Sequence, residues 1–160
     1  RCPACEVAKV RRTHFGASGR EAPASPLPWA RVECDLYGPI KCGDRNGSEY
    51  LFAIICVSTG VVFVQPPRAK SEAVAALRAF ARWFAIRAPA MEAELGVAQG
   101  SLQLGELRCD RGGEFTSTWG ATKSAFDEAV EAIFQGRWFG SPDAPRSSTP
   151  HIERFWGTLR

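Results

Sequence analysis

The segment from Glu49 to Val64 limits the possible folds of this chain more than any other. It contains two apolar runs, Tyr50–Val57 and Val61–Val64, joined by the short turn Ser58-Thr59-Gly60. Apolar runs separated by turn residues are typical of paired strands. Because both runs are almost continuously apolar, we expect these strands to be covered on both faces. The segment therefore predicts a sheet with helices packed on it.

Two other segments alternate between apolar and polar residues, as a strand does. The first is Trp29–Leu36, in which Asp35 lies near the strand end and before a Gly-Pro break. The second is Leu107–Cys109, which is followed by Asp110 and then by Gly112-Gly113. Glycine lets a chain turn sharply and pass close to a ligand. An Asp at a strand end beside such a turn indicates phosphate or metal chemistry, although an ordinary turn Asp gives the same pattern.

Apolar residues at three- and four-residue spacing predict helices in three segments: 71–88, 126–133 and 151–160. Ser71 is expected to be the N-cap of the first helix, and Pro89 is expected to end it. The stretch 90–106 is predicted to be a connector with at most one helical turn, and Trp138-Phe139 a short strand. The order is then strand, strand, strand, helix, strand, helix, short strand, helix. It predicts an α/β fold with a mixed sheet.

Residues 1–20 form a basic arm. They contain five Lys or Arg residues and one Glu, a charge of +4, whereas the whole chain carries +3. A basic arm on a nearly neutral body is typical of proteins that bind an anionic polymer such as nucleic acid. We therefore predict nucleic-acid contacts by Lys9, Arg11 and Arg12, with a solvated tail as the alternative.

Cys2 and Cys5 have the spacing of half a zinc site. His14 is the only histidine nearby, so a zinc site is expected only if ligands upstream of this sequence complete it. A redox pair is the weaker alternative, because no βαβ pattern surrounds the two cysteines. The proline-rich linker 21–28 should run extended, and it separates the zinc-module remnant from a domain at 29–160.

The remaining cysteines, Cys34, Cys56 and Cys109, lie in strand-like, apolar surroundings. We expect them to be reduced core residues of an intracellular protein. No apolar run is long enough to span a bilayer, and no secretory signal is recognisable. The sequence starts without Met and stops inside a predicted helix, so we expect it to be a fragment.

Four segments resemble, in matching order, the integrase catalytic core of retroviruses and long-terminal-repeat retrotransposons, which has a ribonuclease-H-like fold. These segments are Cys2–Lys9, Cys34–Pro39, Cys109–Phe115 and Ser141–Leu159. The first resembles the tail of the family's His-His-Cys-Cys zinc module, and the others resemble the segments that carry its three catalytic acids. The Gly-Gly-Glu-Phe and Glu-Arg-Phe pieces resemble retrotransposons more than retroviruses.

The resemblance implies a metal-binding catalytic triad of Asp35, Asp110 and Glu153, with two Mg²⁺ or Mn²⁺ ions as cofactors. Hard divalent ions prefer carboxylate oxygens, which agrees with this set. The implied activity is that of a polynucleotidyl transferase and endonuclease: water attacks the element's DNA ends, and a 3′-hydroxyl then attacks target DNA. DNA contacts by Arg154 and His151, a homo-oligomer and action in the nucleus are also implied. His151 has the alternative role of a helix cap.

The last segment is shorter than the family pattern. Only His151 and Ile152 separate Pro150 from Glu153, which is four residues fewer than the resemblance predicts. Four helical residues turn about 400° and rise about 6 Å. The side chain of Glu153 should therefore point in nearly the same direction as in the family, but it should lie about 6 Å away along the helix axis. The alternative function is therefore a non-catalytic relic, or a domesticated DNA-binding domain of the same fold. A ribonuclease H is a third reading, but that family's further acidic residue has no clear equivalent.

Overall fold

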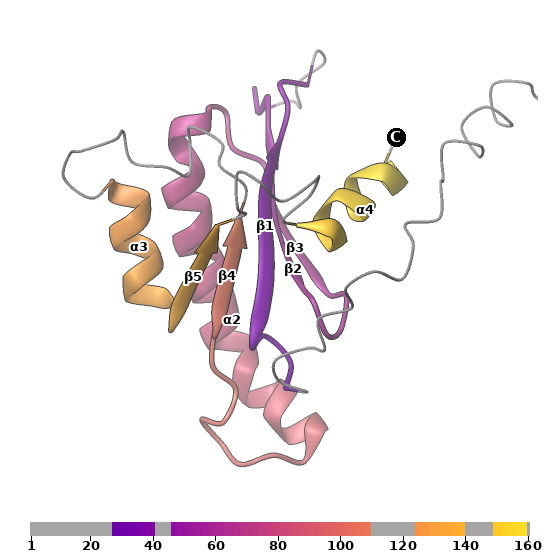
Figure 1. Ribbon diagram of the computed structural model, residues 1–160, viewed down its shortest axis with the longest axis vertical. Helices are drawn as coiled ribbons and strands as arrows, with labels where there is room; N and C mark the ends of the chain where they lie inside the picture. The colour runs from indigo at the N-terminus through magenta and orange to yellow at the C-terminus, as the bar shows by residue number, and fades with distance from the viewer. Residues whose placement is uncertain (1–26, 41–45, 110–123, 140–148, 160) are drawn as a thin grey trace, which may run out of the picture.

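The computed structural model describes residues 27–40, 46–109, 124–139 and 149–159 (Figure 1). Within these ranges a five-stranded sheet forms the centre of the molecule. Its strands are β1 (Arg31–Tyr37), β2 (Leu51–Cys56), β3 (Val62–Gln65), β4 (Glu106–Cys109) and β5 (Gly136–Phe139). Their order across the sheet is β3-β2-β1-β4-β5.

The sheet is mixed, as predicted. The hairpin of β2 and β3 is antiparallel, and β2 is also antiparallel to β1. By contrast, β4 runs parallel to β1, and β5 runs parallel to β4. The register pairs Cys34 with Cys109. The strand that contains Asp35 and the strand that precedes Asp110 in the sequence are therefore neighbours.

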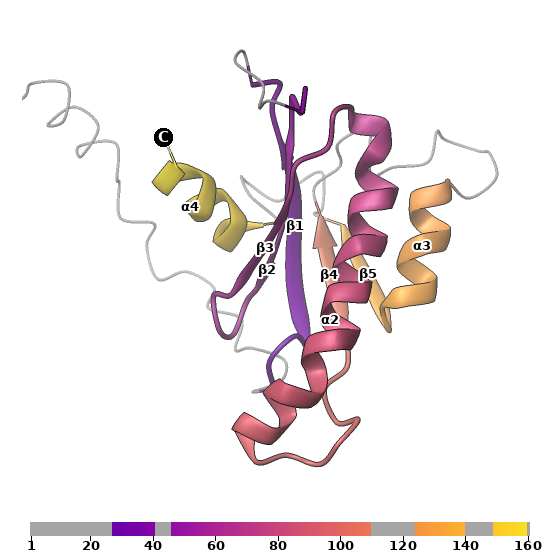
Figure 2. The ribbon, with the colours of Figure 1, turned by 180° about the vertical axis from the view of Figure 1, so that it is seen from behind.

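Helices cover both faces of this sheet, as Figures 1 and 2 show. The helical elements are η1 (Lys70–Glu72), α2 (Ala73–Leu95), α3 (Ala125–Ile133) and α4 (Pro150–Leu159). Both α2 and α3 lie on one face, and α4 lies on the other. The sheet order and its two covered faces are those of the ribonuclease-H-like fold that the sequence predicts.

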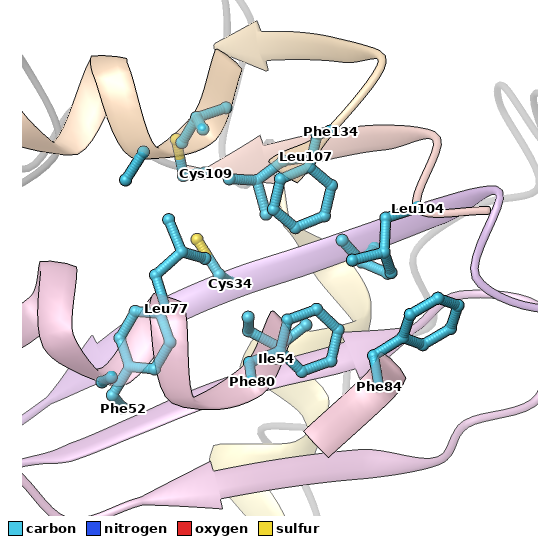
Figure 3. Close-up of a cluster of buried hydrophobic side chains, with 14 of the residues drawn as sticks. Cys34, Phe52, Ile54, Leu77, Phe80, Phe84, Leu104, Leu107, Cys109 and Phe134 are labelled. Carbon is cyan, nitrogen blue, oxygen red and sulfur yellow. The ribbon is translucent and has the colours of Figure 1, made fainter. Parts of the chain in front are cut away.

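The larger core cluster fills the space between the sheet and α2 with α3 (Figure 3). Cys34 and Cys109 belong to this cluster together with Leu77 and Phe80 of α2. Cys34, Cys56 and Cys109 are all buried and form no disulfide, as predicted. No helix among the described residues has the length and hydropathy needed to cross a membrane.

The prediction for the first helix was wrong at both ends. Ser71 lies inside η1 rather than at a helix cap, and α2 begins after Glu72 with no side-chain cap. The helix then continues through Pro89 to Leu95. Proline removes one backbone hydrogen bond within a helix, so the turns beyond it need another source of stability.

That stability comes from Glu92. Its side chain is buried, and its carboxylate accepts hydrogen bonds from the N–H groups of Gly100 and Leu102, each at 2.9 Å. The connector is thereby held against the last turns of α2. The sequence pattern alone gives no sign of this contact, because the connector residues contribute backbone N–H groups rather than recognisable side chains.

Candidate active site

The candidate site lies where α4 crosses the end of β1. Asp35 is half-buried in β1 and points to the face that α4 covers. Its Oδ1 accepts a hydrogen bond from the N–H of Leu36 at 2.7 Å. Its Oδ2 accepts a second bond from the indole Nε1–H of Trp156 at 2.8 Å. Asp35 is thus oriented by its own strand and by α4 together.

Trp156 joins α4 to the sheet in two further ways. Its ring stacks on Tyr37 with centroids 5.3 Å apart and planes inclined by 27°. It also belongs to a small buried cluster with Ile152 and two residues of β2, Ala53 and Ile55. This apolar contact fixes α4 on the sheet, and the polar edge of the indole is left facing Asp35.

A hollow of about 550 Å³ opens beside this contact. Its walls come from the end of β1 and from α4, and the lining residues are Asp35, Leu36, Tyr37, Gly38, Pro39, Glu153, Trp156 and Gly157. Gly38 has φ +142°, and a Cβ there would lie 2.7 Å from the carbonyl oxygen of Glu49. Only glycine fits this part of the wall without strain.

Glu153 reaches the hollow from the first turn of α4. Its side chain is exposed, and its N–H donates to the carbonyl of Thr149 at 3.1 Å. An acid in the first turn of a helix is also favoured by the helix dipole. Asp35 and Glu153, which the sequence pairs only through the family resemblance, therefore line the same hollow despite the short spacing after Pro150.

Glu33 is a residue of this region that the sequence patterns did not point to. This residue alternates onto the same face of β1 as Asp35, yet it is 1% exposed. Its Oε2 accepts hydrogen bonds from the N–H groups of His151 at 2.7 Å and Ile152 at 3.0 Å. Its Oε1 lies 2.7 Å from Nδ1 of His151. The only signal in the sequence was its place two residues before Asp35, since its partners lie more than a hundred residues away.

His151 and Arg154 are the predicted nucleic-acid contacts within the described residues. Both lie on α4, where the His151 side chain is 39% exposed and Arg154 is exposed. The helix-cap role predicted as an alternative for His151 is filled by the carboxylate of Glu33, and the ring of His151 binds that carboxylate. Asp110, Cys2, Cys5, Lys9, Arg11 and Arg12 lie outside the described residues.

The chemistry of the hollow suits a hard divalent ion. Two carboxylates on different elements face a common open space, and carboxylate oxygens are the donors that Mg²⁺ and Mn²⁺ prefer. Within the described ranges no group of three His, Cys, Asp or Glu side chains is placed to hold a metal. The third predicted acid, Asp110, follows the last residue of β4 in the sequence and falls outside those ranges.

No model of a known protein family matches this chain, and no curated protein sequence matches it significantly. Solved structures do. The catalytic core domain of HTLV-2 integrase, in a trimeric form in complex with magnesium, is similar with 17% identity and a TM-score of 0.47 over 82% of this chain and 66% of that one. A simian T-cell lymphotropic virus intasome in complex with the PP2A regulatory subunit B56 gamma is similar with 15% identity and a TM-score of 0.43. That match covers 83% of this chain and 40% of the other.

The chain thus spans just under two thirds of the first of these proteins and a smaller part of the second. Both matches are too distant to say more of this chain than the strand order of its own sheet does.

Proposed function

We propose that this chain is the catalytic domain of a retrotransposon integrase, which cleaves and joins DNA phosphodiesters with two divalent metal ions. The observation that carries the proposal is the shared hollow of Asp35 and Glu153, built from two elements far apart in the sequence. The resemblance adds Asp110 as the third acid. Asp35 and Glu153 would hold Mg²⁺ or Mn²⁺, which when bound would supply activation of the attacking oxygen and stabilisation of the leaving oxygen.

The chain's own residues would bind and orient these ions. Asp35 sits on a rigid central strand, and its carboxylate orientation is fixed by Leu36 N–H and Trp156 Nε1–H. Glu153 sits on α4, which is anchored to the same strand, and it lines the hollow together with Asp35. Carboxylates held on a strand and a helix give more precise metal geometry than carboxylates on loops.

Nucleic acid would approach along α4. Arg154 and the partly exposed ring of His151 lie on this helix, beside the residue that carries the acid. Phosphate contacts by Lys9, Arg11 and Arg12 of the basic arm would add affinity without sequence specificity. We also propose that the protein acts as a homo-oligomer on element ends and target DNA, and that it does so in the nucleus. Zn²⁺ would bind Cys2 and Cys5 only with ligands from a longer chain.

The test is cleavage and strand transfer on a labelled DNA duplex that carries element ends, in Mn²⁺ and in Mg²⁺. Asp35→Asn and Glu153→Gln should each abolish both reactions while DNA binding, measured by gel shift at several salt concentrations, persists. Absence of both reactions in the unmodified protein would refute the catalytic proposal.

One observation favours the alternative of a non-catalytic DNA-binding domain. Trp156 donates a hydrogen bond to Oδ2 of Asp35. A carboxylate oxygen already bound by an indole has one lone pair fewer for a metal. Under this alternative the gel shift is retained and no cleavage occurs in either metal.

A further inference from the structure

Glu33 is a buried acid for which the proposed chemistry has no direct use. It is 1% exposed, and burial of an ionised carboxylate is costly unless hydrogen bonds compensate it. The compensation comes from the first turn of α4, where His151 and Ile152 bind the carboxylate. A charge kept in the interior at this cost indicates a specific role for the contact.

Glu33 binds backbone N–H groups in the first turn of α4, where an α-helix offers them no intrahelical partner. Pro150 occupies the first position of α4, where its missing N–H costs nothing. The next two N–H groups, of His151 and Ile152, have no partner within the helix and donate to Oε2 of Glu33 instead. The negative charge also lies at the positive end of the helix dipole. Glu33 therefore caps α4 from a neighbouring strand.

This cap connects the two acids of the hollow. Glu33 and Asp35 are two residues apart on one face of β1, so their side chains lie about 6–7 Å apart along the strand. Glu153 is the residue that follows Ile152, whose N–H is bonded to Glu33. The hydrogen bonds between Glu33 and the start of α4 thus determine where the backbone of Glu153 lies relative to Asp35.

We infer that Glu33 is a positioning residue, which sets the distance between the carboxylates of Asp35 and Glu153 for divalent-metal binding. This inference rests on the proposed function. The cap is separate from the apolar contact that keeps α4 docked, because Ile152 and Trp156 pack in a cluster with β2 that does not include Glu33. Loss of the cap should loosen the first turn of α4, including Glu153, and leave the fold intact.

Two substitutions of Glu33 distinguish its effect on the position of α4 from the effect of its negative charge. Glu33→Ala removes every acceptor. Glu33→Gln keeps the length of the side chain: its amide oxygen can accept both backbone N–H bonds, and its NH₂ can donate to Nδ1 of His151 in the other ring tautomer. Glu106→Ala is the matched control, because Glu106 is an acid on the same sheet, bonded to Arg108 at 2.7 Å.

The experiment measures Mn²⁺ binding to the 160-residue chain by electron paramagnetic resonance, with amide hydrogen exchange at His151 and Ile152 as a readout independent of metal. Loss of a residue that orients a metal ligand typically costs about 10–100-fold in metal affinity. We expect Glu33→Ala to raise the Kd for Mn²⁺ at least about tenfold and to accelerate exchange at both amides. Glu33→Gln should stay within about threefold of the unmodified protein, and Glu106→Ala should match it.

Equal Mn²⁺ affinity in the unmodified protein and in Glu33→Ala would overturn the positioning role and leave the proposed function standing. Equal losses in Glu33→Ala and Glu33→Gln would also overturn it, because the charge rather than the geometry would then matter. No Mn²⁺ binding by the unmodified protein would refute the proposed function itself. If Glu33→Ala does not fold, Glu33→Asp carries the same test, since it keeps the charge but is one methylene too short to reach the helix.

Discussion

The hydrogen bond between Trp156 and Asp35 gives a stability prediction whose size follows from the structure. Trp156→Phe removes the Nε1–H donor, which lies 2.8 Å from Oδ2, and keeps an aromatic ring against Tyr37. A hydrogen bond to a charged group contributes about 1.5–3 kcal/mol. Asp35 is half-buried, so water can partly replace the lost donor. We therefore expect a loss of about 1–2 kcal/mol in the free energy of unfolding.

Urea denaturation measures this loss. With a slope of about 2 kcal/mol per molar urea, the midpoint of the unfolding transition should fall by about 0.5–1 M. Trp83→Phe controls for the smaller ring, because Trp83 packs on Phe80 in the other core cluster, away from Asp35. A double-mutant cycle with Asp35→Ala isolates the pair, and its coupling energy should be about 1–2 kcal/mol. A coupling energy near zero would refute the reasoning that this bond fixes Asp35 to α4.

Two further predictions concern the part of the fold that leads into β4. Hydrogen bonds from the N–H groups of Leu102 and Gly100 hold the pKa of Glu92 below its ordinary value of 4.5. The carboxylate therefore stabilises the fold above that value, and this stability is lost as the pH falls through the lowered pKa. Urea midpoints of Glu92→Gln and the unmodified protein should differ most near about pH 6–7 and converge as the pH falls below the lowered pKa of Glu92; a difference independent of pH would contradict the assignment. Gly105→Ala would drive a Cβ into the backbone carbonyl just before β1 and should destabilise the protein by about 1–3 kcal/mol. Gly136→Ala, which meets nothing within 4 Å, should cost less, and equal calorimetric Tm values for the two variants would sink this explanation.

The order of the elements was predictable because it depends on local patterns. The continuous apolar run of β2 predicts a strand covered on both faces, and β2 is buried from Phe52 to Cys56. The same expectation was wrong for β3, which is the edge strand of the sheet and has no buried residue. Even the short strand predicted at Trp138-Phe139 is present as β5. Patterns of this kind depend on residues within about one element of each other, so the sequence contains them directly.

The errors arose where contacts with residues further along the chain determine the local structure. Pro89 is a strong local signal for a helix end, and the contacts of Glu92 with the following connector override it. Hydrogen-bond partners of this kind become visible only when the backbone path is known.

The candidate site also contains both residues that could be predicted from the sequence and one that could not. The family resemblance pointed to Asp35 and Glu153, and the structure places both on one hollow. The resemblance gave no reason to consider Glu33, because an acid that alternates with apolar residues in a strand is expected to face solvent. Its burial depends on α4, which covers this part of the sheet.

The contact of Glu33 also offers a physical account of the short spacing between Pro150 and Glu153. A helix that starts closer to the acid could carry Glu153 away from the strand unless its start is fixed. Here the start is fixed by a carboxylate of β1, which binds the N–H groups of the two residues that separate Pro150 from Glu153. The displacement of about 6 Å expected for a four-residue deletion then does not keep Glu153 from the hollow. The carboxylate of Glu33 therefore holds the start of the helix from which Glu153 reaches the hollow.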